Sequence, residues 1–125
     1  MTQVAQRTWR VLLVEDEAMI AMLMEDMLTE FGCEVVATAG QIDQALTVAD
    51  GGAFDIAFLD VNLRGQSVYP VAALLQARAI PFAFVTGYGS AGIDGAHRGA
   101  PVLQKPFQAR DLEAIVRRLQ ARQSG

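Results

Sequence analysis

Cysteine and histidine are nearly absent from this sequence, which contains one of each, Cys33 and His97. A single cysteine excludes an intrachain disulfide, and one cysteine with one histidine cannot supply the usual nitrogen and sulfur ligands of a zinc site. Cys33 opens an apolar run, and we expect it to be a small buried side chain. Any metal site in this chain must therefore use oxygen ligands.

The sequence also lacks an excess of positive charge and a long hydrophobic run. Its formal net charge is -4, and the densest basic group, residues 117, 118 and 122, is what a solvated helix face would carry. A nucleic-acid groove is not expected, because the phosphate backbone needs a basic surface. The longest apolar run, residues 18–24, is far shorter than the roughly 20 residues of a membrane span. The first ten residues show no signal peptide, so we expect a cytoplasmic protein that contacts neither nucleic acid nor membrane.

The 125 residues fit a single domain in which two hydrophobic periods alternate. Apolar runs of strand length are separated by segments with apolar residues at helical spacing. Residues 90–99 contain three glycines, so we expect a short or mobile segment where a fourth helix would lie. The expected strands are 10–14, 35–38, 56–59, 82–85 and 102–103, and the expected helices are 17–31, 42–51, 67–79 and one through 112–119.

This alternation predicts an α/β fold. Continuous apolar strands separated by helices indicate a doubly wound parallel sheet of five strands, covered by helices on both faces and joined by right-handed crossovers. The carboxyl ends of the strands then lie along one edge of the sheet, where such folds bind their ligands. The residues that follow each apolar run are therefore the candidates for a functional site.

Acidic, hydroxyl and basic residues follow four of the expected strands. Glu15 and Asp16 follow the first strand, Asp60 the third, Thr86 the fourth and Lys105 the fifth. Taken singly, each has a simpler explanation: a helix cap for Asp16, a turn for Asp60, a strand hydroxyl for Thr86 and a surface lysine for Lys105. Taken together they are better explained as one site, because acids that converge on a crevice repel each other without a bound cation.

The repulsion within this group indicates what it binds. Two carboxylates about 4 Å apart repel by roughly 4 kcal/mol at an effective dielectric of about 20. Lys105 supplies one positive charge, and an open oxygen site of this kind favours Mg²⁺ over Ca²⁺ for the rest. Mg²⁺ and Lys105 would neutralise phosphoryl oxygens, and the Thr86 hydroxyl would hydrogen-bond one of them. Asp60 would be the nucleophile, while Glu15 and Asp16 would hold the ion.

The segments VLLVEDE, DIAFLDVNL, FVTGYG and LQKPF occur in that order, and with them residues 10–122 resemble the receiver domain of two-component response regulators. The resemblance implies a flavodoxin-like (CheY-like) fold with strand order 2-1-3-4-5. It also implies that Asp60 accepts a phosphoryl group from a sensor histidine kinase or a histidine phosphotransfer protein. Mg²⁺ would be bound directly by Asp16, Asp60 and the backbone carbonyl of Asn62, with Glu15 acting through water.

The same resemblance assigns roles around the fourth and fifth strands. Thr86 matches the family's switch hydroxyl, Lys105 its phosphate-binding lysine, and the Lys105–Pro106 bond its cis peptide. The position of the usual switch aromatic is occupied by Val102. This departure directs attention to the residues that follow Thr86.

FVTGYG resembles the Phe-x-Thr-Gly-Tyr signature of single-domain regulators called FATGUY and of receivers attached to kinases of the HWE (HisKA2) type. Tyr88 would then replace the missing switch aromatic, and Gly87 would leave room for the donor histidine. The alternative for Tyr88 is an exposed loop tyrosine between glycines.

From this resemblance we expect residues 1–125 to be a stand-alone receiver with no output domain. It is not expected to be an enzyme, because it would catalyse only its own phosphorylation and dephosphorylation. Its output would be phosphoryl relay or contact with a partner protein through the 90–122 face, as a monomer or weak dimer. The alternatives are a receiver domain taken from a hybrid histidine kinase and an interaction module that works without phosphorylation.

Two other functions are compatible with the predicted fold. A flavodoxin-like electron carrier would bind a flavin phosphate after the first strand, where Glu15, Asp16 and Glu17 would repel it. A phosphatase that uses Asp60 for turnover would need a second acid at the position of Asn62. Asn62 and Tyr88 are instead expected to set the lifetime of the acyl phosphate on Asp60.

Overall fold

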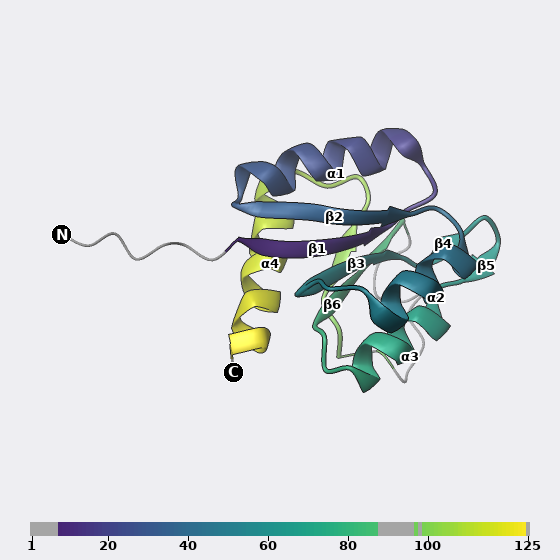
Figure 1. Cartoon of the computed structure of the whole chain (residues 1–125). Coiled ribbons are helices and arrows are strands. Elements are labelled where there is room, and N and C mark those ends of the chain that lie inside the picture. The colour runs from purple at the N-terminus through teal and green to yellow at the C-terminus, as the bar shows by residue number, and fades with distance from the viewer. Residues whose placement is uncertain (1–7, 88–96, 98, 125) are drawn as a thin grey trace.

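The computed structural model describes residues 8–87, 97 and 99–124, which form a parallel β-sheet with helices on both faces (Figure 1). Every pairing between neighbouring strands of this sheet is parallel. The order of the strands across the sheet is β2-β1-β3-β6-β7. The predicted fold and the 2-1-3-4-5 order are thus confirmed. The strands are β1 (Trp9–Val14), β2 (Cys33–Ala39), β3 (Ile56–Asp60), β6 (Phe82–Thr86) and β7 (Val102–Gln104).

In the described part of the chain, two helices cover each face of the sheet. α1 (Ala18–Glu30) and α4 (Ala109–Ser124) lie on one face, and α2 (Ile42–Gly51) and α3 (Tyr69–Ala77) lie on the other (Figure 1). Compared with the expected helices 17–31 and 67–79, α1 and α3 are shorter by one or two residues at each end. None of the helices in the described part of the chain is long and apolar enough to cross a membrane.

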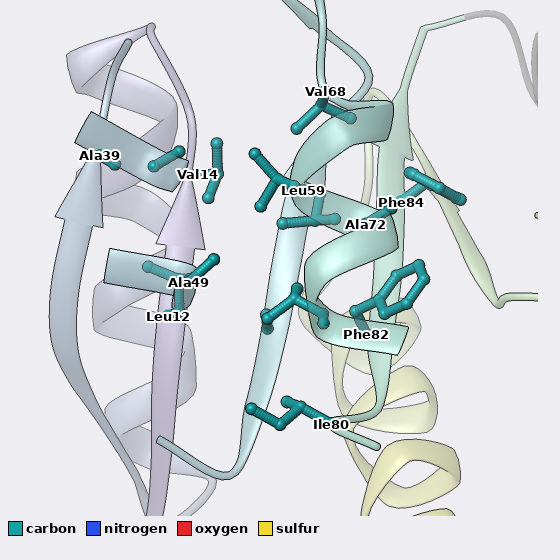
Figure 2. Packing of buried hydrophobic residues seen from close by; sticks show 14 of the residues in the cluster. Leu12, Val14, Ala39, Ala49, Leu59, Val68, Ala72, Ile80, Phe82 and Phe84 are labelled. Atoms are coloured by element: carbon teal, nitrogen blue, oxygen red, sulfur yellow. The ribbon is translucent and has the colours of Figure 1, made fainter. Parts of the chain in front are cut away.

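The sheet is buried on both faces, which is why its strands read as continuous apolar runs. In β1, Val11 and Leu13 pack in the cluster that contains α1 and α4 side chains, whereas Leu12 and Val14 pack with α2 and α3. Successive side chains of a strand point to opposite faces, so one run of residues contributes to both layers. Figure 2 shows the layer between the sheet and the α2 and α3 helices. Cys33 is the first residue of β2 and is 4% exposed, as predicted.

A short hairpin between β3 and α3 was not evident from the sequence pattern. β4 (Asn62–Leu63) and β5 (Gln66–Ser67) pair antiparallel through a two-residue turn, in which Arg64 has a φ of 51° and Gly65 a φ of 83°. Two-residue turns with both φ values positive match the twist of a hairpin, and glycine adopts such values without strain. The hairpin extends from the carboxyl end of β3, beside the expected site.

The sole histidine takes part in packing. The His97 ring stacks on Tyr69 with centroids 5.3 Å apart and meets Phe84 edge to face at 5.8 Å. The rest of the 90–99 segment, apart from Gly99, lies outside the described residues, and the expectation of a short or mobile segment there stays a prediction.

Candidate functional site

Four acidic side chains meet at the carboxyl ends of the central strands. Glu15 and Asp16 follow β1, and Asp60 is the last residue of β3. Glu17 joins them, and each of the four offers a carboxylate oxygen within 4.8 Å of the others. The structure therefore brings together the acids that the sequence analysis selected and adds a fourth.

Lys105, the only lysine in the sequence, directs its ammonium group into this cluster. Its Nζ lies 3.2 Å from Oε1 of Glu15, 3.4 Å from Oδ2 of Asp60 and 3.4 Å from Oε1 of Glu17. The backbone at Lys105 is held by an N–H donated to the Thr86 carbonyl at 2.8 Å, and its peptide bond to Pro106 is cis. One ammonium group is thus shared by three carboxylates.

Glu15 is the most deeply buried of these acids, with a side chain that is 1% exposed. Its Oε2 accepts a hydrogen bond from the Glu17 N–H at 3.1 Å, whereas its Oε1 accepts none from the described residues and lies 3.2 Å from the Lys105 ammonium. Burial, together with the neighbouring Asp60 carboxylate, raises the pKa of Glu15 to about 7. A cation bound near this buried oxygen would stabilise the ionised form of Glu15.

Asp60 and Lys105 show the same balance of burial and charge. Burial raises the pKa of Asp60, although Lys105 and the Asn62 N–H, which donates to Oδ1 at 3.3 Å, act in the other direction. Burial lowers the pKa of Lys105, but Asp60 and Glu15 outweigh it and leave that pKa above its usual value. Without another cation the buried acids hold protons unusually well, while the lysine stays charged.

The β4–β5 hairpin fixes two of the expected metal ligands. Asp16 does not cap α1; its Oδ2 accepts the backbone N–H of Arg64 at 3.2 Å, which joins the loop after β1 to the hairpin turn. The side chain of Asn62 accepts the N–H of Gly65 at 2.7 Å and so closes the same turn. The turn therefore orients both the acid and the segment that carries the Asn62 backbone carbonyl.

The hydroxyl and the glycine expected at the end of β6 border the same site. Thr86 is the last residue of β6 and is 3% exposed, one position beyond Val85, which pairs with Asp60. Gly87 lines the pocket that contains Asp60 and Lys105, and a Cβ placed on it would meet no described atom within 4 Å. Tyr88 lies outside the described residues, so its role stays a prediction.

Two features of the site were not assigned from the sequence. Glu17 is the residue directly after the acidic pair, and its position at the end of a buried strand was the available signal. The Arg64–Gly65 turn was indicated only by one glycine, because two-residue strands are too short to show an alternating pattern. Both features line the open pocket next to Asp60.

The residues present fit a hard divalent cation. Four carboxylates cluster, three of them share one ammonium group, and the buried Oε1 of Glu15 accepts no hydrogen bond within the described part of the chain. Oxygen ligands that leave part of the coordination sphere open to water are the type that Mg²⁺ prefers. The donor set is therefore suited to Mg²⁺.

Comparison with known proteins gives one family. The sequence-family model of the response regulator receiver domain matches residues 11–117. The transcriptional regulatory protein TcrA of Mycobacterium tuberculosis is 35% identical over 120 residues, which are 90% of this chain and 46% of that protein. The chain spans about half the length of the curated relatives it matches.

Solved structures show the same fold. SdrG from Sphingomonas melonis is 42% identical with a TM-score of 0.76, and the match covers 94% of this chain and 98% of that one. The receiver domain of the sensor histidine kinase PA1611 from Pseudomonas aeruginosa is 24% identical with a TM-score of 0.78, covering 92% and 99% of the two chains. That receiver was solved with a magnesium ion coordinated in its active site cleft.

Proposed function

This chain belongs to the family of response regulator receiver domains, and from that starting point we propose that Asp60 accepts a phosphoryl group from a phosphohistidine of a sensor histidine kinase. The observation that carries the proposal is the position of Asp60. Its carboxylate lies at the carboxyl end of the central strand β3, with Oδ2 3.4 Å from the Lys105 ammonium and in an open pocket. A nucleophile and a cation for the transferred group are thus adjacent.

The transfer needs no other reactant. A carboxylate oxygen of Asp60 forms a bond to phosphorus while the phosphorus–nitrogen bond of the donor breaks, and the electron pair stays on the imidazole nitrogen. The Lys105 ammonium then pairs with a phosphoryl oxygen in place of the Asp60 oxygen. The Thr86 hydroxyl, at the end of the neighbouring strand, donates a hydrogen bond to another phosphoryl oxygen.

We infer that Asp16, Asp60 and the backbone carbonyl of Asn62 hold Mg²⁺, with Glu15 acting through water. When bound, the ion neutralises charge on the phosphoryl oxygens and on the clustered acids. The protein's own part is to keep these oxygens in place: the Arg64 N–H orients Asp16, and the hairpin turn orients the Asn62 segment. The same cation would lower the pKa of Asp60 and so keep the nucleophile ionised.

The finer assignments rest on the sequence signature. FVTGYG supports membership of the FATGUY-type receivers and a donor kinase of the HWE type, for which Gly87 leaves space beside Asp60. The output is contact with a partner protein through the 90–122 face or passage of the phosphoryl group to a histidine protein. The site of action is the cytoplasm, where sensor kinases present their phosphohistidine.

The test is the intact mass of the protein after incubation with acetyl phosphate and Mg²⁺, with wild type beside Asp60→Asn. The expected result is a phosphoryl adduct that requires Mg²⁺ and is absent from the variant. Because small donors react slowly with some proteins, the same comparison is repeated with a purified phosphorylated histidine kinase of the HWE type. Absence of the adduct with both donors would exclude phosphoryl acceptance and favour an interaction module that works without it.

A further inference from the structure

Glu17 stands between the buried acids and the solvent. Its Oε1 lies 3.4 Å from Nζ of Lys105, the same distance that separates Nζ from Oδ2 of Asp60. Unlike Glu15, whose side chain is 1% exposed, the Glu17 side chain is 64% exposed. Glu17 also lines the pocket that leads to Asp60. It is therefore the most exposed of the four clustered carboxylates at the pocket that contains Asp60.

The Glu17 side chain does not cap α1. Glu17 occupies the N-cap position of this helix, where a side-chain oxygen usually accepts a backbone N–H, but it makes no such capping hydrogen bond. The Glu17 backbone makes the hydrogen bonds at this helix end: the N–H donates to Glu15 Oε2 at 3.1 Å, and the carbonyl accepts the N–H of Ala21 at 2.9 Å. A change of the side chain alone leaves both backbone contacts possible.

The position of this charge affects anionic donors in two ways. The negative carboxylate repels a phosphoryl group on its way to Asp60, and it binds the ammonium group of Lys105 that must pair with the phosphoryl oxygens. At a separation of about 6 Å in water, such a charge would disfavour a monoanion roughly threefold and a dianion roughly tenfold. Both effects grow with the charge of the donor, because a dianion is repelled more strongly by the carboxylate and attracted more strongly by the ammonium group.

We propose that Glu17 is a specificity-determining residue that disfavours small dianionic phosphoryl donors at Asp60. The inference rests on the proposed function, because it concerns the choice of donor for the same reaction. A phosphohistidine on a kinase is carried by a protein whose surface contacts offset the local repulsion. A free acyl phosphate has no such contacts, so the site responds to the kinase in preference to metabolites of that class.

The experiment compares Glu17→Gln with wild type, using two small donors of different charge. Acetyl phosphate is a dianion near neutral pH and phosphoramidate is a monoanion. Rates of adduct formation on Asp60 are followed by intact mass at low ionic strength, with Mg²⁺ at a concentration above which the rate no longer changes. We expect Glu17→Gln to accelerate the reaction roughly tenfold with acetyl phosphate and roughly threefold with phosphoramidate. The rate with acetyl phosphate divided by the rate with phosphoramidate would then be about threefold higher in Glu17→Gln than in wild type. At about 1 M salt this ratio should return toward the wild-type value.

Two matched variants test whether the effect comes from the charge at position 17 or from the net charge of the protein. Glu17→Asp keeps the charge and is expected to keep a ratio close to that of wild type. Glu34→Gln changes the net charge by the same amount at an exposed position near the amino end of β2, away from the pocket, and is expected to leave the ratio unchanged. The same ratio change in Glu34→Gln would overturn the inference, because net charge would then explain it.

The remaining outcomes are also decisive. An equal acceleration with both donors, or a slower reaction of Glu17→Gln, would overturn the inference while an adduct on Asp60 still supported the proposed function. The absence of any adduct on wild type and Glu17→Gln with both small donors and with the phosphorylated kinase would overturn the proposed function and this inference together. An adduct that small donors give only with Glu17→Gln would support both.

Discussion

The Lys105 ammonium lies 3.4 Å from the carboxylate of Asp60, a residue 45 positions earlier in the sequence, and it is the only lysine in the chain. This pair links the ends of two strands that are not neighbours in the sheet, since β6 lies between β3 and β7. The contact places the positive charge that the proposed phosphoryl transfer needs beside the proposed nucleophile. It also gives the site a pKa pattern that can be measured directly.

The Lys105 amine is expected to stay protonated to a higher pH than an ordinary lysine, because the Asp60 and Glu15 carboxylates outweigh the effect of burial on its pKa. Reductive methylation with carbon-13 labels this single lysine side chain, and its NMR signal can be titrated in the absence of Mg²⁺. Asp60→Asn and Glu15→Gln should each lower the midpoint. A wild-type midpoint below that of a free lysine model would contradict the structure.

The stability of the metal-free protein is expected to fall as the pH rises from about 4.5 to 7. The pKa of Glu15 is about 7 in the folded protein and 4.5 in the unfolded chain, so within this window the folded state binds more protons. The stabilisation is complete below the unfolded pKa and is lost as the pH rises through the folded one. Its size is on the order of 3 kcal/mol.

Urea unfolding between pH 4.5 and 8 in the presence of a chelator measures this dependence. Glu15→Gln is the matched control and should flatten the profile over the same window. Saturating Mg²⁺ should flatten it as well, because a bound cation lowers the pKa of the buried acids. If the free energy of unfolding of the metal-free wild type is constant or rises across this window, the pKa of Glu15 is not raised in the folded protein.

Asp60→Asn is expected to stabilise the metal-free protein while it abolishes phosphorylation. Burial raises the pKa of Asp60, so its ionised form costs free energy that a neutral amide does not. The gain should be roughly 1 to 2 kcal/mol, the part of the cost of burying an ionised carboxylate that Lys105 does not offset. Chemical unfolding in the presence of a chelator measures it, and a less stable variant would show that the Asp60–Lys105 pair outweighs the cost of burial.

Mg²⁺ is expected to raise the melting temperature of the wild type, because it would bind only the folded site. At about 100 times its dissociation constant the ion adds about 2.7 kcal/mol. Asp16→Asn should lose most of this gain, and Glu34→Gln, which removes an acid far from the site, should keep it. Thermal unfolding over a range of Mg²⁺ concentrations distinguishes these cases, and equal shifts in the two variants would argue against a site at Asp16.

Gly65→Ala is expected to destabilise the fold by about 1 to 2 kcal/mol through the backbone alone. A Cβ at Gly65 would meet no atom of the described residues within 4 Å, but the residue has a φ of 83°. Gly51→Ala is the control, since its Cβ also enters open space and its φ is not positive. Gly51→Ala should therefore be neutral or stabilising by up to about 1 kcal/mol. Gly65→Ala should in addition weaken Mg²⁺ binding, because the Arg64–Gly65 turn orients Asp16 and Asn62.

The fold was predictable because its strands are buried on both faces and its helices on one. These two burial patterns leave different periods in the sequence, as in β1 and α2, so the elements and their alternation could be identified. The β4–β5 hairpin could not, because its strands have two residues each and carry no period. Its only long-range side-chain hydrogen bond among the described residues comes from Asp16, whose carboxylate accepts the Arg64 N–H from 48 positions away.

By itself the sequence determined which residues end the parallel strands, and therefore that Glu15, Asp16, Asp60, Thr86 and Lys105 share one edge of the sheet. Strands that alternate with helices run parallel, so their carboxyl ends lie at one edge, and the sequence pattern alone is enough to predict this. Only the tertiary structure decided how the charges are shared: that Lys105 contacts Glu17 as well as Glu15 and Asp60, and that burial raises the pKa of Glu15. Distances and desolvation arise when segments far apart in the chain pack together, and no local pattern in the sequence records them.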